Sequence, residues 1–238
     1  MKSTLFFAAI LTGSLFTLSA CQQENNPVLP DPILNGLIYQ ANFQQGKDGW
    51  EADYTDYHTQ IGDIRFESSW TGLPKPLDTT RKSIMISSMN RSDDVFMFMK
   101  KKLTGLRANT DYKLVFDIEL ASAYADNSVG VGGSPGGSVY LKAGATAIEP
   151  KKVLKDDYYD INIDKGAQSN AGKDAVLLGN IGAGNDVTDY KLITRNNTEA
   201  PLTARTNDKG ELWLIVGTDS GYEGLTTLYY SNIKVTAK

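Results

Sequence analysis

Apolar residues from about residue 37 onward never recur over a long stretch at the spacing of about 3.6 that a helix requires. Short segments rich in β-branched and aromatic residues are separated instead by Gly, Asn and Asp. The pattern predicts strands at Leu37–Phe43, Asp63–Ser68, Ser83–Met89, Val95–Leu103, Asp111–Ala121, Gly137–Ala143, Tyr158–Ile163, Lys173–Ile181, Lys191–Thr198, Leu212–Thr218 and Thr226–Thr236. Many short strands with turn signals between them predict an all-β fold, an antiparallel sandwich or barrel.

The alternation is clearest in LTGLRANTDYKLVFDIELA, residues 103–121. After the turn Ala-Asn-Thr, every second residue of the strand is apolar: Tyr112, Leu114, Phe116, Ile118 and Leu120. One face of this strand is therefore expected to be buried. The turn before Tyr112 resembles the sandwich corner in which a tyrosine hydroxyl bonds back to the backbone, so we expect a structural role for Tyr112.

The stretch NRSDDVFMF, residues 90–98, places polar residues directly before an apolar run. Because the run is apolar on both faces, we expect a central strand that is covered on both sides. The polar residues have two interpretations. They cap the turn that precedes the strand, or they contact a ligand at the rim of the sandwich through the donors of an arginine and the acceptors of its neighbours. The ligand candidates are Asn90, Arg91, Asp93 and Asp94.

Trp70 interrupts the polar stretch SSWTGLP, residues 68–74, which is expected to be a loop. An indole face can stack on the apolar face of a sugar ring, which makes Trp70 a further ligand candidate. A loop aromatic can equally close the end of a sandwich. Both interpretations stay open. Tyr57 and Tyr124, in similar surroundings, are expected to be such end plugs.

The glycine-rich stretch GVGGSPGG, residues 130–137, lacks the context of a phosphate loop, because the residues after it predict a strand rather than a helix. It is expected to be a connection between strands. His58 is the sole histidine, and no Gly-x-Ser-x-Gly motif is present, so nothing indicates a Ser–His–Asp site. A pair of carboxylates, as glycosidases use, is compatible with the sequence but not indicated by it.

The N-terminal residues 1–20 have one lysine, an apolar run and small residues, which predicts a secretion signal rather than a membrane-spanning helix. Leu18-Ser19-Ala20-Cys21 resembles the lipobox of bacterial lipoproteins, in which the cysteine is acylated. Cys21 is the sole cysteine, so it cannot form an internal disulfide. The alternative is a plain secreted protein. Residues 21–36 read as the lipidated Cys and a flexible linker, and 37–238 as one domain. The resemblance implies a lipid bilayer as partner, at the outer membrane.

The formal net charge of the chain is −4, and removing Lys2 with the signal makes it −5. A mildly acidic domain without a clustered basic surface argues against nucleic acid as a partner. The sole basic run, Lys100–Lys102, alternates between the faces of a strand and is expected to be solubilising.

Two segments make the fold prediction more specific. ANFQQGKDGWEADYTDY, residues 41–57, and TLYYSNIKVTAK, residues 227–238, look like the first and last strands of galactose-binding-like jelly rolls, the sandwiches of many carbohydrate-binding modules. Together with NRSDDVFMF and GVGGSPGGSVYLKAGA, the chain resembles a set of bacterial lipoproteins without an established activity. The resemblance implies a jelly-roll β-sandwich. It also implies a possible structural calcium, for which Asp48, Glu51 and Asp53 are the candidate ligands.

These observations favour a lipid-anchored protein of the cell envelope, with a non-catalytic module that binds a glycan or an envelope partner. One alternative is a carbohydrate-active hydrolase that uses a pair of carboxylates. Another is a purely structural subunit of an envelope assembly.

Overall fold

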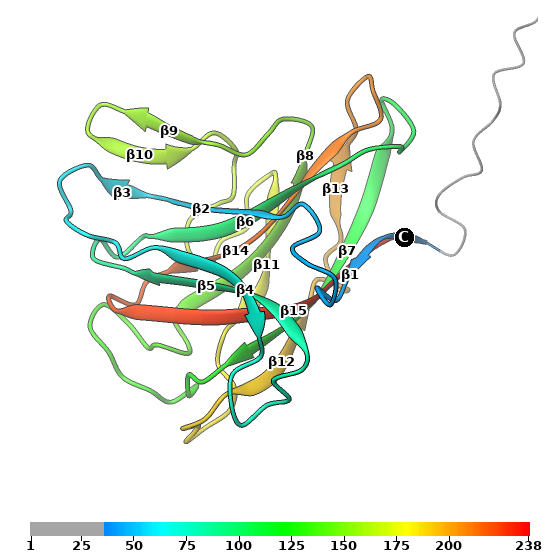
Figure 1. The fold of residues 1–238 in the computed structure, drawn as a ribbon. Helices are drawn as coiled ribbons and strands as arrows, with labels where there is room; N and C mark the ends of the chain where they lie inside the picture. The colour runs from blue at the N-terminus through cyan, green and yellow to red at the C-terminus, as the bar shows by residue number, and fades with distance from the viewer. Residues whose placement is uncertain (1–35) are drawn as a thin grey trace, which may run out of the picture. The chain divides into compact units, whose positions relative to one another are not determined.

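The computed structural model describes residues 36–238 as fifteen strands in three sheets, without a helix (Figure 1). The predicted all-β jelly-roll sandwich is confirmed. Within these residues we find no helix with the length and apolar character that a bilayer span requires. The predicted signal peptide, the acylation of Cys21 and the linker up to residue 35 lie outside the described residues.

The larger sheet has seven strands. Each of the two long strands at its centre has two shorter strands paired side by side along one of its edges. Its main order is β12 (Lys191–Asn196), β7 (Asp111–Ser122), β15 (Leu225–Ala237), β5 (Lys82–Met89) and β4 (Glu67–Gly72). β1 (Leu37–Ala41) pairs with the C-terminal half of β15, and β13 (Leu202–Arg205) pairs with the N-terminal part of β7. All of these pairings are antiparallel.

The second sheet has the order β11 (Ala175–Asn180), β8 (Val139–Thr146), β14 (Leu212–Ser220), β6 (Phe96–Leu103) and β2 (Glu51–Thr55). A small third sheet consists of β3 (Tyr57–His58), β10 (Tyr158–Ile161) and β9 (Lys152–Lys155). The segment between β8 and β11, which carries β9 and β10, is inserted between two neighbouring strands of the second sheet, and it covers part of that sheet's outer face.

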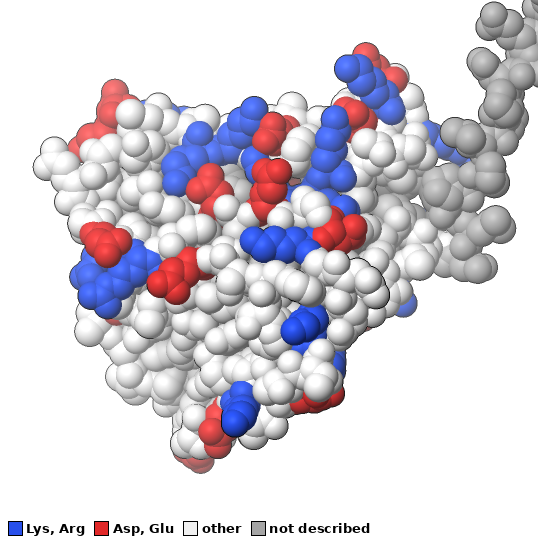
Figure 2. Space-filling model, in the orientation of Figure 1, with Lys and Arg blue, Asp and Glu red and all other residues white. Residues whose placement is uncertain are grey.

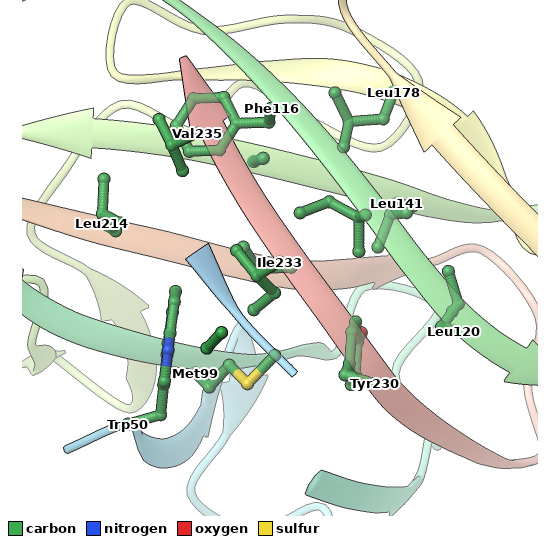
Figure 3. Close-up of a cluster of buried hydrophobic side chains, with 14 of the residues drawn as sticks. Trp50, Met99, Phe116, Leu120, Leu141, Leu178, Leu214, Tyr230, Ile233 and Val235 are labelled. Atoms are coloured by element: carbon green, nitrogen blue, oxygen red, sulfur yellow. The ribbon is translucent and has the colours of Figure 1, made fainter. Parts of the chain in front are cut away.

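The main core lies between the two large sheets, because the alternating residues of each strand place one apolar set on the inner face. Figure 3 shows side chains from both sheets meeting there, with Met99 and Leu214 from one sheet and Phe116 and Ile233 from the other. Trp50, just before β2, closes the cluster and is buried.

A second, smaller core covers the outer face of β6. Phe96 and Phe98 stack on one another with ring centroids 5.3 Å apart, and both are fully buried. They pack against Ile215 of β14 and against Ile161 and Ile163 of the inserted segment. The prediction that β6 is covered on both sides is therefore confirmed.

The corner before β7 also has the predicted structure. The backbone N–H of Arg107 donates a hydrogen bond to the Tyr112 hydroxyl at 3.1 Å, and Asn109 adopts a left-handed φ of 50°. Tyr112 thus ties its own turn to the strand that follows it.

Four strands were not predicted, and one was misplaced. β2, β3, β9 and β13 are short and polar, with two to five residues each. The strand expected at Asp63–Ser68 begins only at Glu67. Residues 63–66 instead form a connection in which Ile64 is buried against Tyr57 and Val95.

Candidate functional site

Three connections meet at the end of the sandwich that lies away from β1. We call this end the distal rim and define it as residues 90–95, 123–138 and 221–224. Asn90 N–H donates to the Gly224 carbonyl at 3.0 Å, and Glu223 N–H donates to the Val131 carbonyl at 2.9 Å. At the opposite end, Ala237 N–H donates to the Gly36 carbonyl at 2.6 Å. Because β15 runs between the two ends, the rim lies about 40 Å from the point where the chain enters the domain (Figure 1).

Asn90 has a structural role. Its amide nitrogen donates to the carbonyls of Ser220 at 2.7 Å and Tyr222 at 2.9 Å. Its amide oxygen accepts the N–H groups of Ser92 at 3.1 Å and Val95 at 3.4 Å. The side chain is buried and all its bonding capacity is used inside the protein. The ligand interpretation of Asn90 is therefore not supported, and the turn interpretation holds for this residue.

Arg91 and Asp93 are exposed on the distal rim. The Arg91 Nε donates to the Asp63 carbonyl at 3.0 Å. Asp93 has a left-handed φ of 60°, and its carbonyl accepts a bond from the Gln168 side chain at 2.9 Å. The side chains of Arg91 and Asp93 both remain open to a partner.

Asp94 lines a pocket of about 390 Å³ beside the inserted segment. The hydroxyl of Tyr158 in β10 donates to Asp94 Oδ2 at 3.2 Å. The remaining lining comes from the residue between β2 and β3, from β10 and from the connection after β10: Asp56, Asp160, Ile161, Ile163, Asp164, Lys165, Gly166 and Ala167. We call this hollow the Asp94 pocket.

Buried charges form the floor beneath the Asp94 pocket. Asp56, Asp94 and Asp219 each offer a carboxylate oxygen, and these oxygens lie within 4.8 Å of one another. Lys165 Nζ lies 2.8 Å from Asp56 Oδ2 and 2.6 Å from Asp219 Oδ2. Lys142 Nζ lies 3.2 Å from the same Asp219 oxygen. We call these five residues the charge cluster, in which Asp56 and Asp219 are paired with the protein's own lysines.

Backbone groups complete the cluster. Lys142 Nζ donates to the carbonyls of Lys165 at 2.9 Å, Gly166 at 3.0 Å and Asn170 at 3.0 Å. The Gln168 N–H donates to Asp219 Oδ2 at 2.9 Å. These bonds fix the connection after β10 to β8 and β14 of the large sheet.

Burial and neighbouring charge shift the ionisation of the cluster. Burial alone would lower the pKa of Lys165, but Asp219 and Asp56 outweigh that effect and raise it. Burial lowers the pKa of Lys142, against the influence of Asp219. Burial, followed by the charge of Asp219, raises the pKa of Asp94 to about 6. Burial also raises the pKa of Asp56, against the influence of Lys165, so both carboxyls that the cluster presents to the pocket have raised pKa values.

Asp94→Asn is expected to stabilise the domain at about pH 7.5 and to have little effect near pH 4. Between the usual carboxyl pKa of 3.8 and the folded value of about 6, the folded state binds more protons than the unfolded state. Stability contributed by this group therefore falls as the pH rises through that window. Without screening, this pKa shift corresponds to a change of about 3 kcal/mol in the free energy of unfolding. Because solvent screens a half-buried carboxyl, we expect Asp94→Asn to gain about 1–2 kcal/mol. Urea unfolding at both pH values measures the difference, and an equal effect at both would contradict the assignment.

Trp70 lies in strand β4, at the open edge of the larger sheet, and not in the expected loop. The residue is 42% exposed. The indole N–H donates to the Phe43 carbonyl at 2.8 Å, and Lys82 Nζ lies 5.4 Å from the ring centroid. The hydrogen bond fixes the ring in one orientation while part of it faces solvent.

A polar groove of about 540 Å³ adjoins Trp70 through Phe43. Four amide side chains and one carboxylate line it: Gln40, Asn42, Gln44, Gln45 and Asp48. We call this hollow, together with Trp70, the amide groove. Charged side chains of both signs gather over β2 and the β9–β10 hairpin on the face shown in Figure 2, whereas few lie over β4 and β5.

The expected calcium ligands Asp48, Glu51 and Asp53 do not form a metal site in this structure. Asp48 Oδ2 lies 3.5 Å from Lys101 Nζ, and Asp53 Oδ1 lies 3.0 Å from Lys152 Nζ. Glu51 is exposed. The first two carboxylates already have lysine partners, and the three do not converge on one point, so these positions do not fit the ion.

Of the two tyrosines expected as plugs, Tyr124 ties two connections together, and Tyr57 lies in β3 of the small sheet. The Tyr124 hydroxyl donates to the Leu225 carbonyl at 3.2 Å and accepts the Thr227 N–H at 2.8 Å. Tyr57 is buried and stacks against Tyr54 with centroids 5.1 Å apart. His58 is exposed and lies 3.7 Å from Asp157. Its T-shaped contact with the Tyr158 ring is a surface packing interaction.

No protein-family model matches this sequence, and no curated protein matches it either. Among solved structures, it is similar to a candidate sugar-binding protein from Bacteroides thetaiotaomicron VPI-5482, with a TM-score of 0.44, 11% identity, and coverage of 83% of this chain and 92% of that one. It is also similar to the mannan-recognising carbohydrate-binding module TmCBM27, with a TM-score of 0.40, 11% identity, and coverage of 85% and 97%.

A third similar structure is the family 11 carbohydrate-binding module of the cellulase Lic26A-Cel5E of Clostridium thermocellum, with a TM-score of 0.39, 11% identity, and coverage of 84% and 94%. Likeness at these identities and TM-scores carries no argument about function. What this chain binds has to be argued from its own surface.

Proposed function

We propose that the domain is a non-catalytic module that binds a glycan through the amide groove. The observation that carries this proposal is the oriented, half-exposed indole of Trp70 beside a groove lined by four side-chain amides. Each amide offers two donors and one acceptor oxygen, which suits neighbouring hydroxyls on a sugar ring. The indole supplies an apolar face on which such a ring can stack.

The groove is better suited to hydroxyl groups than to an anion. Asn42 Oδ1 already accepts the Gln44 N–H at 3.2 Å, and Asp48 Oδ2 accepts the Tyr39 hydroxyl at 2.6 Å. These bonds hold the loop in shape and leave the exposed amides of Gln44 and Gln45 to reach outward. A carboxylate within the lining disfavours an acidic polymer.

The proposal includes a lipid anchor at Cys21, with the module held at the cell envelope, on the outer membrane. Attached acyl chains contribute about 0.8 kcal/mol for each buried methylene, and two chains make such an anchor stable. A tether would join the domain at Gly36, at the end of the sandwich opposite the distal rim.

Trp70→Ala is expected to weaken retention on a glycan at least tenfold, which corresponds to about 1.4 kcal/mol, because the stacking face is removed. The assay uses the full chain in detergent on a panel of immobilised envelope and plant polysaccharides, and it scores retention and released sugar together. Trp70→Phe is the matched control: it keeps an aromatic face and loses the bond to Phe43, so we expect it to retain most of the binding.

Equal retention by the wild type and Trp70→Ala would place binding elsewhere. Release of soluble sugar would replace the proposal with a hydrolase. Absence of retention on every polysaccharide, together with co-purification of an envelope protein, would favour a structural subunit.

A carbohydrate-active hydrolase is the second candidate, because Asp94 has a raised pKa and lies in a pocket next to two further carboxylates. Asp56 and Asp219 are both bonded to Lys165, however. Neither is a free base or nucleophile in this arrangement, so the binding module has the stronger case.

A further inference from the structure

The Asp94 pocket carries more negative than positive charge. The charge cluster beneath it has three carboxylates and two ammonium groups, a formal charge of −1 when all are ionised. Asp160 and Asp164 add carboxylates to the lining. These two are engaged locally: Asp160 Oδ2 pairs with Lys155 at 2.5 Å, and Asp164 accepts the N–H groups of Gly166 and Lys173. They contribute a negative potential, and Asp94 is left as the group that can make a direct contact.

Asp94 is the carboxylate of the cluster that lacks a cationic partner. The lysines bind Asp56, Asp219 and backbone carbonyls, and within residues 36–238 no lysine or arginine forms an ion pair with Asp94. One of its oxygens accepts the Tyr158 hydroxyl, and the other has no hydrogen bond in this part of the chain.

A second acceptor in the same group is also unused. Asp219 is fully buried, and within residues 36–238 its Oδ1 has no hydrogen-bond partner, although Oδ2 accepts two hydrogen bonds and lies 3.2 Å from Lys142 Nζ. A buried carboxylate oxygen without a donor is costly, and it leaves the charge cluster with more acceptor capacity than its own donors use.

We propose that the Asp94 pocket is a second ligand site, which binds the ammonium group of an unacetylated amino sugar. An ammonium supplies three donors and one positive charge, and it would offset the residual charge of the cluster. Two ammonium groups already lie at the base, so a divalent metal ion would meet stronger repulsion there. Ile161 and Ile163 offer an apolar wall to the ring, and a pocket of about 390 Å³ is in the usual range for small ligands.

The choice of a sugar amine over other amines rests on the proposed glycan-binding function, whereas the preference for a cation does not. The site is separate from the amide groove in residues and in elements. Failure at one site can therefore be distinguished from failure at the other.

Binding is expected to depend on pH, because the ionised form of Asp94 accepts the ammonium. The charged and titratable groups around it come from every element packed there: Asp56, His58, Arg91, Asp93, Lys142, Tyr158, Asp160, Asp164, Lys165 and Asp219. With the pKa of Asp94 at about 6, the ionised fraction falls about tenfold between about pH 7 and about pH 5. Affinity should fall by the same factor.

The test is a titration of the full chain in detergent with glucosamine, glucose and N-acetylglucosamine, followed by NMR or calorimetry at both pH values. We expect glucosamine to bind in the millimolar range at neutral pH and the two uncharged sugars to bind at least tenfold more weakly. Asp94→Asn should abolish the preference, and Asp189→Asn, which removes an exposed carboxylate elsewhere, should preserve it. Trp70→Ala should leave glucosamine binding unchanged, and Asp94→Asn should leave polysaccharide retention unchanged.

Equal binding of glucose and glucosamine, no binding of either, or a preference that survives Asp94→Asn would each overturn the proposal. Tighter binding of a lysine derivative than of glucosamine would overturn the assignment to an amino sugar. Tighter binding of calcium than of either amine would overturn the choice of an ammonium.

Discussion

Asp219→Ala is expected to destabilise the domain by about 3–5 kcal/mol, because it leaves Lys142 and Lys165 buried without their shared carboxylate. The side chains of Lys142 and Asp219 are both fully inaccessible to solvent. Neither lysine could therefore recover hydration without opening the structure. Chemical denaturation with a two-state analysis measures the loss.

Asp111→Ala is the matched control for this substitution. Asp111 pairs with Arg205 at 3.2 Å, and both side chains are more than half exposed. An exposed pair of this kind contributes about 0–1 kcal/mol. If Asp219→Ala cost no more than Asp111→Ala, the charge cluster would not stabilise the fold in the way its geometry indicates. Asp219→Ala combined with Lys142→Met should recover part of the loss, because one stranded charge is then absent.

Phe98→Ala is expected to cost about 3–5 kcal/mol, the usual range for emptying a buried aromatic site. Phe98 is fully buried on the outer face of β6, where it supports the inserted segment through Ile161 and Ile163. The cavity lies under that segment, and we therefore expect amide hydrogen exchange to accelerate most in residues 152–168. The Asp94 pocket should be disturbed at the same time, since its lining comes from this segment.

Leu154→Ala provides the comparison within the same segment. Leu154 lies in β9 and is 55% exposed, so its truncation should change stability by less than about 0.5 kcal/mol. If the Phe98→Ala variant instead showed faster exchange evenly over both large sheets, the second core would not be separate from the main one. That result would mean that Phe98 acts through the main core.

The elements that could be predicted were those whose local pattern agrees with their final surroundings. Every second residue of β7 from Tyr112 to Leu120 is apolar and buried, so this face could be predicted residue by residue. β6 is apolar on both faces, and both faces are in fact covered, one by each core. Tyr112 could be assigned to its corner because its hydrogen-bond partner, Arg107, is only five residues away in the sequence.

The missed strands are stabilised by their partners rather than by their own pattern. β2, with the sequence EADYT, and β13, with LTAR, have too few apolar residues to show a period. Each becomes a strand because a long neighbour, β6 or β7, offers unpaired backbone groups along one edge. Such pairing is nonlocal, and four or five residues do not encode it.

The charge cluster could not be predicted as a unit, because its members come from five separate segments. One signal was present. Lys142 interrupts the otherwise apolar VYLKAGAT, and Asp219 ends the apolar LIVGTDS. A charged side chain inside a buried strand requires a partner of opposite charge. The sequence therefore indicates that an ion pair exists, but not which residues form it. Trp70 was placed in a loop because its neighbours are Ser, Thr and Gly, yet these small residues form an edge strand.

The pairing of β1 with β15 also determines how the domain would carry a mechanical load. A pull on Gly36 directed away from the distal rim acts along β1, and the strand could leave only by sliding past β15. The rungs from Leu37 to Ala41 would then bear the force side by side, in shear, and would not open one after another like a zipper. A load applied between Gly36 and the distal rim would thus be resisted in the stronger of the two loading directions.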